Sequence, residues 1–243
     1  MSETARPAFY ALAPGGWRDY VTLLHPPYTA WHLSYVAIGA ALAPHFRWWV
    51  LGLALAAFFL GMGVAAHALD ELHGRPLETR IPRRLLVLLA AVSLTAAAGI
   101  GVVTAVYTSL WLLAFVAAGT FIAVAYNLEL FGGRFHGDLW FALAWGAFPV
   151  LATYFASAET IRVEAILAAA FAALFSHAQR LLSTPVRRLR RQAKAVSGEI
   201  DLIDGTSIQI TRETLTADAE RALQVLAASV VTLAVALVVL RVT

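Results

Sequence analysis

Long apolar runs, each about the length of a membrane-spanning helix, alternate along this chain with short polar segments. A helix that crosses the hydrocarbon core of a bilayer needs about 20 mostly apolar residues. The pattern predicts an all-α polytopic membrane protein with seven transmembrane helices, forming a single membrane domain over residues 1–243. The predicted spans are residues 28–44, 47–69, 85–106, 109–128, 138–157, 160–180 and 219–240.

The composition supports a lipid environment. Of the 243 residues, 60% are hydrophobic and 14% are charged, whereas a soluble domain has about 45–50% apolar and about 25% charged residues. Helices of a large soluble bundle would each show a polar face, and these runs show none. Cysteine is absent, which excludes disulfides and thiolate metal sites. The net charge of +3 is small and indicates no nucleic-acid partner.

The basic residues predict how the bundle lies in the membrane. With seven spans, only Arg47, Arg162 and Arg241 of the 18 Lys and Arg residues fall on one side. Cytoplasmic loops are the ones enriched in Lys and Arg. We therefore expect a protein integral to the cell membrane, with its amino terminus in the cytoplasm and its carboxy terminus outside.

One long loop, residues 181–218, joins the sixth and seventh predicted spans. Its first part, "STPVRRLRRQAK", is expected to continue the sixth helix along the membrane surface, where its arginines meet water and anionic headgroups. Its second part, "EIDLIDGTSIQITRE", alternates apolar and polar residues around Asp204-Gly205, which predicts a small cytoplasmic β-hairpin near 199–212. We expect the hairpin to lie near the mouth of the pocket described next, and Thr216 to cap the last helix.

Ionisable residues from five predicted helices fall at one depth, on the predicted cytoplasmic side. His67, Asp70 and Glu71 share one helix face, because they stand at positions i, i+3 and i+4. Ionisable groups at membrane depth are costly and usually face a cavity. We therefore expect a hydrophilic mouth above an apolar chamber, with His67 and His177 brought together on the second and sixth helices.

Three segments resemble the UbiA-type superfamily of intramembrane prenyltransferases. The first is Ala66-His67-x-x-Asp70 followed by "GRPLETRIP" at 74–82, which is similar to the family motif N-D-x-x-D-x-x-x-D and its Arg-Pro loop. The second is "YNLELFGGRFHGDLWFALAWGAFPVL" at 126–151, and the third is the sixth helix. The resemblance covers roughly residues 20–195. It implies a helical bundle with a polar cap over a lipid-open chamber, and a prenyl diphosphate substrate with Mg²⁺.

The chain departs from the family pattern at the residues that would bind the metal. Ala66 and His67 replace the family's Asn and first Asp, and no third Asp follows. The second motif offers His177 and Arg180 where the family has paired aspartates, and the family usually has nine spans. Because Mg²⁺ prefers oxygen ligands, these changes weaken the implied metal site.

The resemblance nevertheless implies a role for each residue that remains. The metal ion that the resemblance implies, Mg²⁺, would be bound by Asp70, Glu71 and His73. Catalytic roles fall to His67, Asp70 and His177, as bases or polar orienting groups. The substrate, a prenyl diphosphate or another polyisoprenoid lipid, would be bound by Arg75, Arg80, Arg180, Tyr126, Asn127 and His32.

Two alternatives stay open beside a prenyltransferase-like enzyme. The loss of the motif aspartates also fits a non-catalytic membrane protein that binds a lipid or a partner. A metal or haem protein on the same scaffold is the further alternative, because His32, His67, His73 and His177 offer nitrogen ligands beside Asp70 and Glu71.

Overall fold

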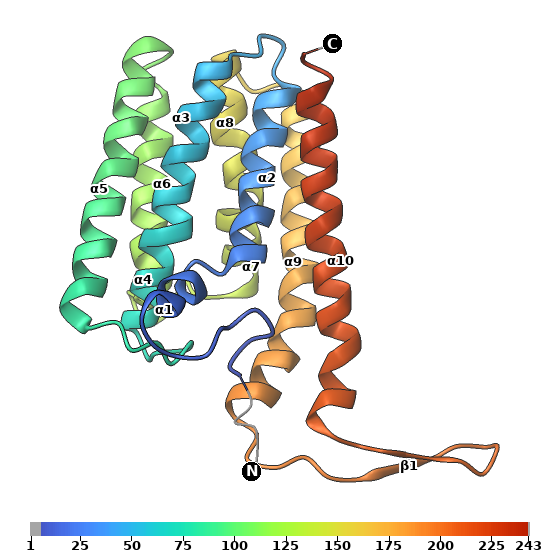
Figure 1. The fold of residues 1–243 in the computed structure, drawn as a ribbon. Helices are drawn as coiled ribbons and strands as arrows, with labels where there is room; N and C mark the ends of the chain where they lie inside the picture. The colour runs from blue at the N-terminus through green and yellow to red at the C-terminus, as the bar shows by residue number, and fades with distance from the viewer. Residues whose placement is uncertain (1–5, 243) are drawn as a thin grey trace.

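A computed structural model describes residues 6–242 of the chain as a bundle of roughly parallel helices with a small β-hairpin at one end (Figure 1). We call this end of the bundle the hairpin end; the described chain starts there and finishes at the opposite end. The elements are α1 (Trp17–Leu23), α2 (Pro26–Leu42), α3 (Trp48–Phe58), η1 (Phe59–Ala66), α4 (His67–Leu72), α5 (Arg83–Tyr107), α6 (Leu112–Asn127), α7 (Asp138–Phe141), η2 (Ala142–Ala147), α8 (Phe148–Ala158), α9 (Val163–Arg191), β1 (Glu199–Asp201), β2 (Ser207–Gln209) and α10 (Arg212–Val239).

Five helical stretches of residues 6–242 are long and apolar enough to cross a membrane, which supports the predicted helical membrane protein. They are Trp48–Leu72, Arg83–Tyr107, Asp138–Ala158, Val163–Arg191 and Arg212–Val239. The other two predicted spans form α2, of 17 residues, and α6, of 16 residues. Both run alongside the longer helices (Figure 1). Each is shorter than the about 20 residues that a membrane span needs. Seven spans therefore remain a prediction.

Glycine allows the central helices to approach one another closely. A Cβ atom on Gly39 of α2 would lie 2.4 Å from the carbonyl oxygen of Val150 in α8. A Cβ atom on Gly146 of η2 would lie 2.5 Å from the carbonyl oxygen of Ala172 in α9. Both distances are far shorter than a van der Waals contact. Helix packing inside membranes commonly uses small residues in this way, because lipid tails offer no hydrophobic driving force between helices.

Two π-helical segments, η1 and η2, interrupt the second and fifth predicted spans. The wider turn of a π-helix is uncommon and is found frequently at functional sites. The segment η1 leads directly into His67 and Asp70 of α4, and η2 carries the buried side chain of Trp145. Pro149 follows η2 at the start of α8.

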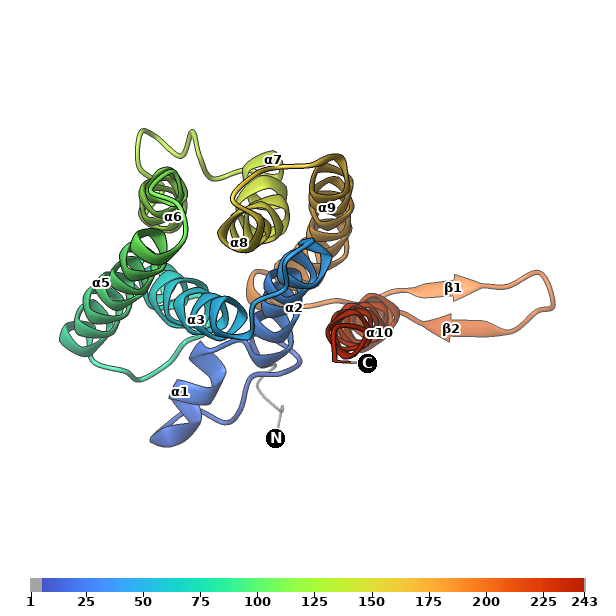
Figure 2. The same ribbon diagram turned by 90° about the horizontal axis from the view of Figure 1, so that it is seen from above.

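The predicted β-hairpin is confirmed, and its place near the mouth of the pocket stays a prediction. Ile200 pairs with Ile208 across antiparallel strands β1 and β2, and the side chain of Asp204 accepts hydrogen bonds from the backbone and hydroxyl of Thr206 in the turn. The hairpin projects sideways from the bundle (Figures 1 and 2).

The last helix begins earlier than predicted. Its N-cap is Thr211, whose side chain accepts a hydrogen bond from the Thr214 backbone while the Thr214 side chain accepts one from the Thr211 backbone. This capping box satisfies free N–H groups at the helix start. Thr216, the predicted cap, is buried within the helix. The prediction that "STPVRRLRRQAK" continues the sixth helix is confirmed as far as Arg191, because α9 runs without a break from Val163 to Arg191.

Candidate functional site

A polar cavity of about 450 Å³ lies between the helices. Its walls come from the N-terminal segment, α2, η1, α4, α6, the loop before α7, and the second half of α9. Apolar side chains contribute a smaller part of the wall, including Met62, Phe141 and Trp145. The polar lining residues are Tyr10, His25, Tyr28, His32, His67, Asp70, Tyr126, Asn127, Glu129, His136, Gln179, Arg180, Ser183, Arg187, Arg191 and Gln192.

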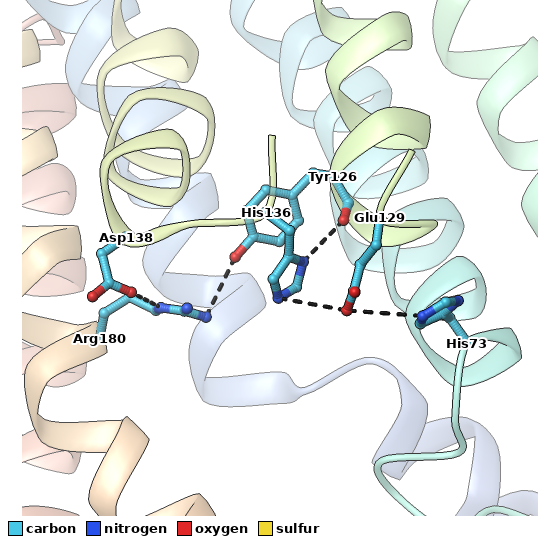
Figure 3. A network of polar contacts seen from close by, with 6 residues as sticks. All are labelled: His73, Tyr126, Glu129, His136, Asp138 and Arg180. Carbon is cyan, nitrogen blue, oxygen red and sulfur yellow. Dashed lines mark hydrogen bonds and ion pairs between the residues drawn. The ribbon is translucent and has the colours of Figure 1, made fainter. Parts of the chain in front are cut away.

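Three arginines of α9 give the cavity its positive charge. Arg180 forms an ion pair with Asp138 at 2.9 Å and donates to the hydroxyl of Tyr126 at 3.3 Å (Figure 3). Arg187 donates to the hydroxyl of Thr184, and Arg191 donates to the carbonyl oxygen of Pro7. Within residues 6–242 neither Arg187 nor Arg191 forms an ion pair with a carboxylate. Their charge is therefore free to act on an anion in the cavity.

Arg187 and Arg191 line the cavity, whereas the sequence interpretation placed these arginines at the membrane surface. The signal that identifies them is their spacing with two polar residues earlier in α9. Gln179, Ser183, Arg187 and Arg191 recur every four residues, and side chains at this spacing lie on one helix face. Arg188 lies outside this stripe and is exposed.

A second polar network lies at the α6 edge of the cavity, around Glu129 (Figure 3). The carboxylate of Glu129 lies 3.8 Å from Nε2 of His73 and 4.0 Å from Nε2 of His136. The Nδ1 atom of His136 lies 3.0 Å from the carbonyl oxygen of Tyr126. His73, predicted as a metal ligand, therefore faces Glu129 and does not line the cavity.

Backbone carbonyls set the tautomers of three cavity histidines. Nδ1 of His32 lies 2.8 Å from the carbonyl oxygen of Trp145, and Nδ1 of His67 lies 3.0 Å from that of Gly63. His136 makes the corresponding bond to Tyr126. A carbonyl oxygen only accepts, so Nδ1 carries the proton in each ring. In the neutral form each ring therefore presents an unprotonated Nε2, which can accept a proton or a hydrogen bond.

The N-terminal segment, residues 6–12, supplies part of the cavity wall. The hydroxyl of Tyr10 lies 2.8 Å from Nδ1 of His25. Burial raises the pKa of Tyr10 above its ordinary value, and burial lowers the pKa of His25 below its ordinary value. Both side chains are therefore neutral at pH 7. This segment could not be identified from the sequence, because it is short and lacks periodicity.

The structure brings six of the predicted site residues to the cavity. His67 and Asp70 were predicted as catalytic groups, and the others were predicted to bind substrate. Their gathering supports the predicted polar layer. The six residues are His32, His67, Asp70, Tyr126, Asn127 and Arg180.

His177, Arg75 and Arg80 do not line the cavity. His177 lies on α9, but it is Gln179, Arg180 and Ser183 that face the cavity. The ring of His67 stacks instead on that of His25, with centroids 4.1 Å apart. The predicted meeting of His67 and His177 is therefore replaced by a pair of histidines from α4 and the start of α2.

The loop after α4 is held together by residues that had been predicted to bind ligands. Arg75 donates to the carbonyl oxygens of Thr79 and Ile81. Glu71 is fully buried, and its two oxygens accept from the backbone of Leu77 and from the backbone and hydroxyl of Thr79. The backbone N–H of Arg80 donates to Asp19. These bonds satisfy buried polar groups and give Glu71 and Arg75 structural positions.

The predicted metal ligands do not come together. Glu71 is engaged by the loop, and His73 faces Glu129. In the part of the chain that the structure describes, no group of three His, Asp or Glu side chains has the arrangement of a metal site. Of the three predicted metal ligands, only Asp70 lines the cavity. The donor set predicted for Mg²⁺ therefore does not fit this geometry.

An apolar chamber adjoins the polar cavity. It has a volume of about 130 Å³ and is enclosed by α3, η1, α5, α6, η2 and α8. Met62 of η1 and Trp145 of η2 line both the chamber and the cavity. The two π-helical segments thus supply the boundary between a charged compartment and an apolar one, as the sequence pattern predicted in outline.

Comparisons with known proteins give no relative from which a function could be transferred. No protein-family model, no curated protein and no solved structure matches this chain. The resemblance to UbiA-type prenyltransferases therefore stays an expectation from the sequence. The function must be argued from the geometry of the cavity and the chamber.

Proposed function

We propose that this membrane protein binds a prenyl diphosphate or a closely related polyisoprenoid phosphate. The observation that carries the proposal is the shared boundary at Met62 and Trp145, which joins an arginine-lined cavity to an apolar chamber. A lipid of this class has the same two parts, an anionic head and an apolar tail. The head would lie against α9, and the tail would pass between Met62 and Trp145 towards the surrounding lipid.

The charges of the cavity suit a diphosphate head. Arginine binds phosphate oxygens through a planar fork of donors, and such charge-assisted bonds are about twice as strong as neutral ones. Arg187 and Arg191 have no carboxylate partner within residues 6–242. Tyr28, Tyr126 and Asn127 add neutral donors around them. Arginine would therefore supply the charge that the weakened aspartate motif no longer provides.

The histidine tautomers support a prenyltransferase-like reaction of this lipid. Unprotonated Nε2 atoms on His32 and His67 line the cavity. Either atom can accept a proton from a nucleophilic acceptor as the new bond to the prenyl carbon forms and the bond to the diphosphate breaks. The arginines would stabilise the charge on the departing diphosphate.

A non-catalytic lipid-binding protein is the second candidate, and one observation favours it. The carboxylate of Glu71 is committed to the loop, so the acidic cluster expected beside Asp70 does not form. Incubating the protein with labelled farnesyl diphosphate and Mg²⁺ separates the two candidates. Release of diphosphate above that of an Asp70→Ala, His67→Ala variant supports the enzyme, and binding without release supports the carrier.

Calorimetry of the purified protein in detergent tests the binding itself. We expect farnesyl diphosphate to bind more tightly than inorganic diphosphate or farnesol, because only the full lipid uses both compartments. If farnesol bound as tightly as farnesyl diphosphate, the arginines would not contribute to binding. If inorganic diphosphate bound as tightly, the chamber would not contribute. Absence of binding by any prenyl phosphate would overturn the proposed function.

A substitution in the chamber makes this test more specific. Ala123 of α6 is buried and lines the chamber, whereas Ala118 of the same helix is exposed. We expect Ala123→Leu to weaken farnesyl diphosphate binding about tenfold while inorganic diphosphate binds as before, because the added carbon atoms occupy space needed by the tail. Ala118→Leu is the matched control and should bind both ligands normally. An unchanged affinity in Ala123→Leu would place the tail elsewhere.

We also propose that all seven predicted spans cross the membrane, in a UbiA-like bundle with the hairpin end in the cytoplasm. The distribution of arginine and lysine supports this orientation. Because the chain has no cysteine, single cysteines report it cleanly. His45→Cys, between α2 and α3, should react with an impermeant maleimide in intact cells, and Asp204→Cys in the hairpin should react only after permeabilisation. The reverse pattern would invert the orientation.

A further inference from the structure

His25 occupies an uncommon backbone position directly before α2. Its φ of 46° and ψ of 57° lie in the left-handed region, which residues other than glycine rarely adopt. Such positions persist when the surroundings hold them, and they cluster at ligand sites. The ring of His25 lines the cavity and lies nearly parallel to that of His67, at an interplanar angle of 13°. The fold therefore places this imidazole at a defined point of the cavity wall.

One nitrogen of His25 has a partner and the other has none. Nδ1 lies 2.8 Å from the hydroxyl of Tyr10. Nε2 is buried and makes no hydrogen bond within the described chain. Nearly all buried polar atoms in proteins have a partner. A buried nitrogen without one, in the wall of a cavity, indicates a position that a ligand atom completes.

Counting donors and acceptors decides which nitrogen carries the proton. If Nδ1–H of His25 donated to Tyr10, the phenolic proton and the Nε2 lone pair would both lack partners. If the Tyr10 hydroxyl donates to Nδ1, only one group, Nε2–H, is left without a partner. Each unsatisfied buried group costs free energy, so the second arrangement is favoured. His25 then carries a donor, Nε2–H, on a ring that belongs to the cavity wall, whereas the rings of His32 and His67 carry acceptors.

The N-terminal segment holds Tyr10 in place. It crosses the hairpin end of the bundle (Figure 1). Arg190 donates to the carbonyl oxygen of Arg6, and Arg191 donates to that of Pro7. The backbone N–H of Leu12 donates to the hydroxyl of Thr22. Residues 6–12 are thus fastened to α9 on one side and to α1 on the other, with Tyr10 between.

We propose that Nε2–H of His25 donates a hydrogen bond to a phosphoryl oxygen of the bound lipid, and that Tyr10 is the positioning residue that fixes this tautomer. Phosphoryl oxygens accept hydrogen bonds, so the head is complementary to this donor and to the arginines opposite. The contact with phosphate rests on the proposed function. The tautomer is a property of the ligand-free protein and is tested without any ligand.

Nitrogen-15 NMR of histidine-labelled protein tests the tautomer. The His25 signals are assigned by their loss in a His25→Gln variant. We expect Nε2 to be protonated and Nδ1 unprotonated in the wild type, and a mixture of both tautomers in Tyr10→Phe. Tyr20→Phe, in the exposed part of α1, is the control and should leave the signals unchanged. A protonated Nδ1 in the wild type, or no change in Tyr10→Phe, would overturn the role of Tyr10.

Binding of farnesyl diphosphate, measured with the full chain, tests the contact. We expect His25→Ala to weaken binding about tenfold to a hundredfold, the range typical of a hydrogen bond to a charged group. His25→Gln should recover part of the loss, since its amide N–H can replace Nε2–H. His45→Gln, at an exposed position far along the chain, should bind normally.

The outcomes separate the two proposals. If the wild type binds and His25→Ala binds equally well, the His25 contact is wrong while the proposed function stands. If the wild type does not bind, the proposed function and the contact with its ligand both fail, and the NMR result alone decides the role of Tyr10. Helical circular dichroism and a single gel-filtration peak confirm that each variant is folded.

Discussion

Replacing Arg187 and Arg191 together with glutamine is expected to weaken farnesyl diphosphate binding a hundredfold or more. Each guanidinium lines the cavity and lacks a carboxylate partner among the residues the structure describes. A hydrogen bond to a charged group contributes about 1.5–3 kcal/mol, and about 1.4 kcal/mol corresponds to a factor of ten in affinity. The loss of two such contacts should therefore weaken binding more than His25→Ala or Ala123→Leu does.

The single variants and a control identify the cause of the loss. Arg188→Gln removes the same charge one residue away, from an exposed position outside the cavity, and should bind normally. Arg187→Lys should recover part of the affinity, because it restores the charge without the bidentate fork. Calorimetry measures farnesyl diphosphate binding by Arg187→Gln, Arg187→Lys, Arg188→Gln and the double variant. Equal losses in Arg187→Gln and Arg188→Gln would show a general charge effect and contradict the proposed site.

Substitution of these arginines is expected to weaken ligand binding without lowering the stability of the ligand-free protein. Arg180, Arg187 and Arg191 lie close enough on α9 to repel one another, and like charges on one helix face are destabilising. Arg187→Gln should therefore leave the ligand-free protein as stable as the wild type, or slightly more stable. Residues of functional sites commonly lower the stability of the ligand-free protein in this way. A binding loss that accompanied unfolding would have to be assigned to packing instead.

Gly39→Ala is expected to destabilise the folded bundle by about 3 kcal/mol, at the upper end of the usual range for overpacking. The added Cβ would lie 2.4 Å from the carbonyl oxygen and 3.0 Å from the Cα of Val150. Both atoms belong to the backbone of α8, so no side chain can rotate away. The helices α2 and α8 must separate, which loses the close packing that stabilises helices in membranes.

Gly99→Ala is the matched control, because it makes the same change at a glycine of α5 with open space around it. Alanine is the better helix former by about 1 kcal/mol, so this variant should be at least as stable as the wild type. Unfolding in mixed dodecyl sulfate and maltoside micelles, followed by circular dichroism, measures both variants. Equal stability of Gly39→Ala and Gly99→Ala would contradict the close approach of α2 and α8.

Several features of this protein follow from the sequence because their causes are local. A helix that crosses a membrane needs about 20 mostly apolar residues, so long apolar runs identify such helices. The predicted ranges agree with the helical segments to within a few residues at most ends. The hairpin follows from alternation around Asp204-Gly205, where Gly205 adopts a φ of 85°. The polar layer follows from the position of His67, Asp70 and Arg180 near the ends of apolar runs.

Other features depend on contacts that no local pattern contains. Helix rotation decides whether a polar side chain enters the cavity, which is why Arg187 lines it and His177 does not. Tertiary hydrogen bonds took Glu71 into the loop after α4. The N-terminal segment lies beside the site because residues far along the chain hold it there: Arg190 and Arg191 donate to its carbonyl oxygens, and Leu12 donates to Thr22. Hydrophobicity and turn chemistry act over neighbouring residues, so the apolar helices, the hairpin and the polar residues near the helix ends could be predicted from the chain alone. The tertiary structure alone decided which of those polar residues share a cavity, because that depends on how the packed helices are turned towards one another.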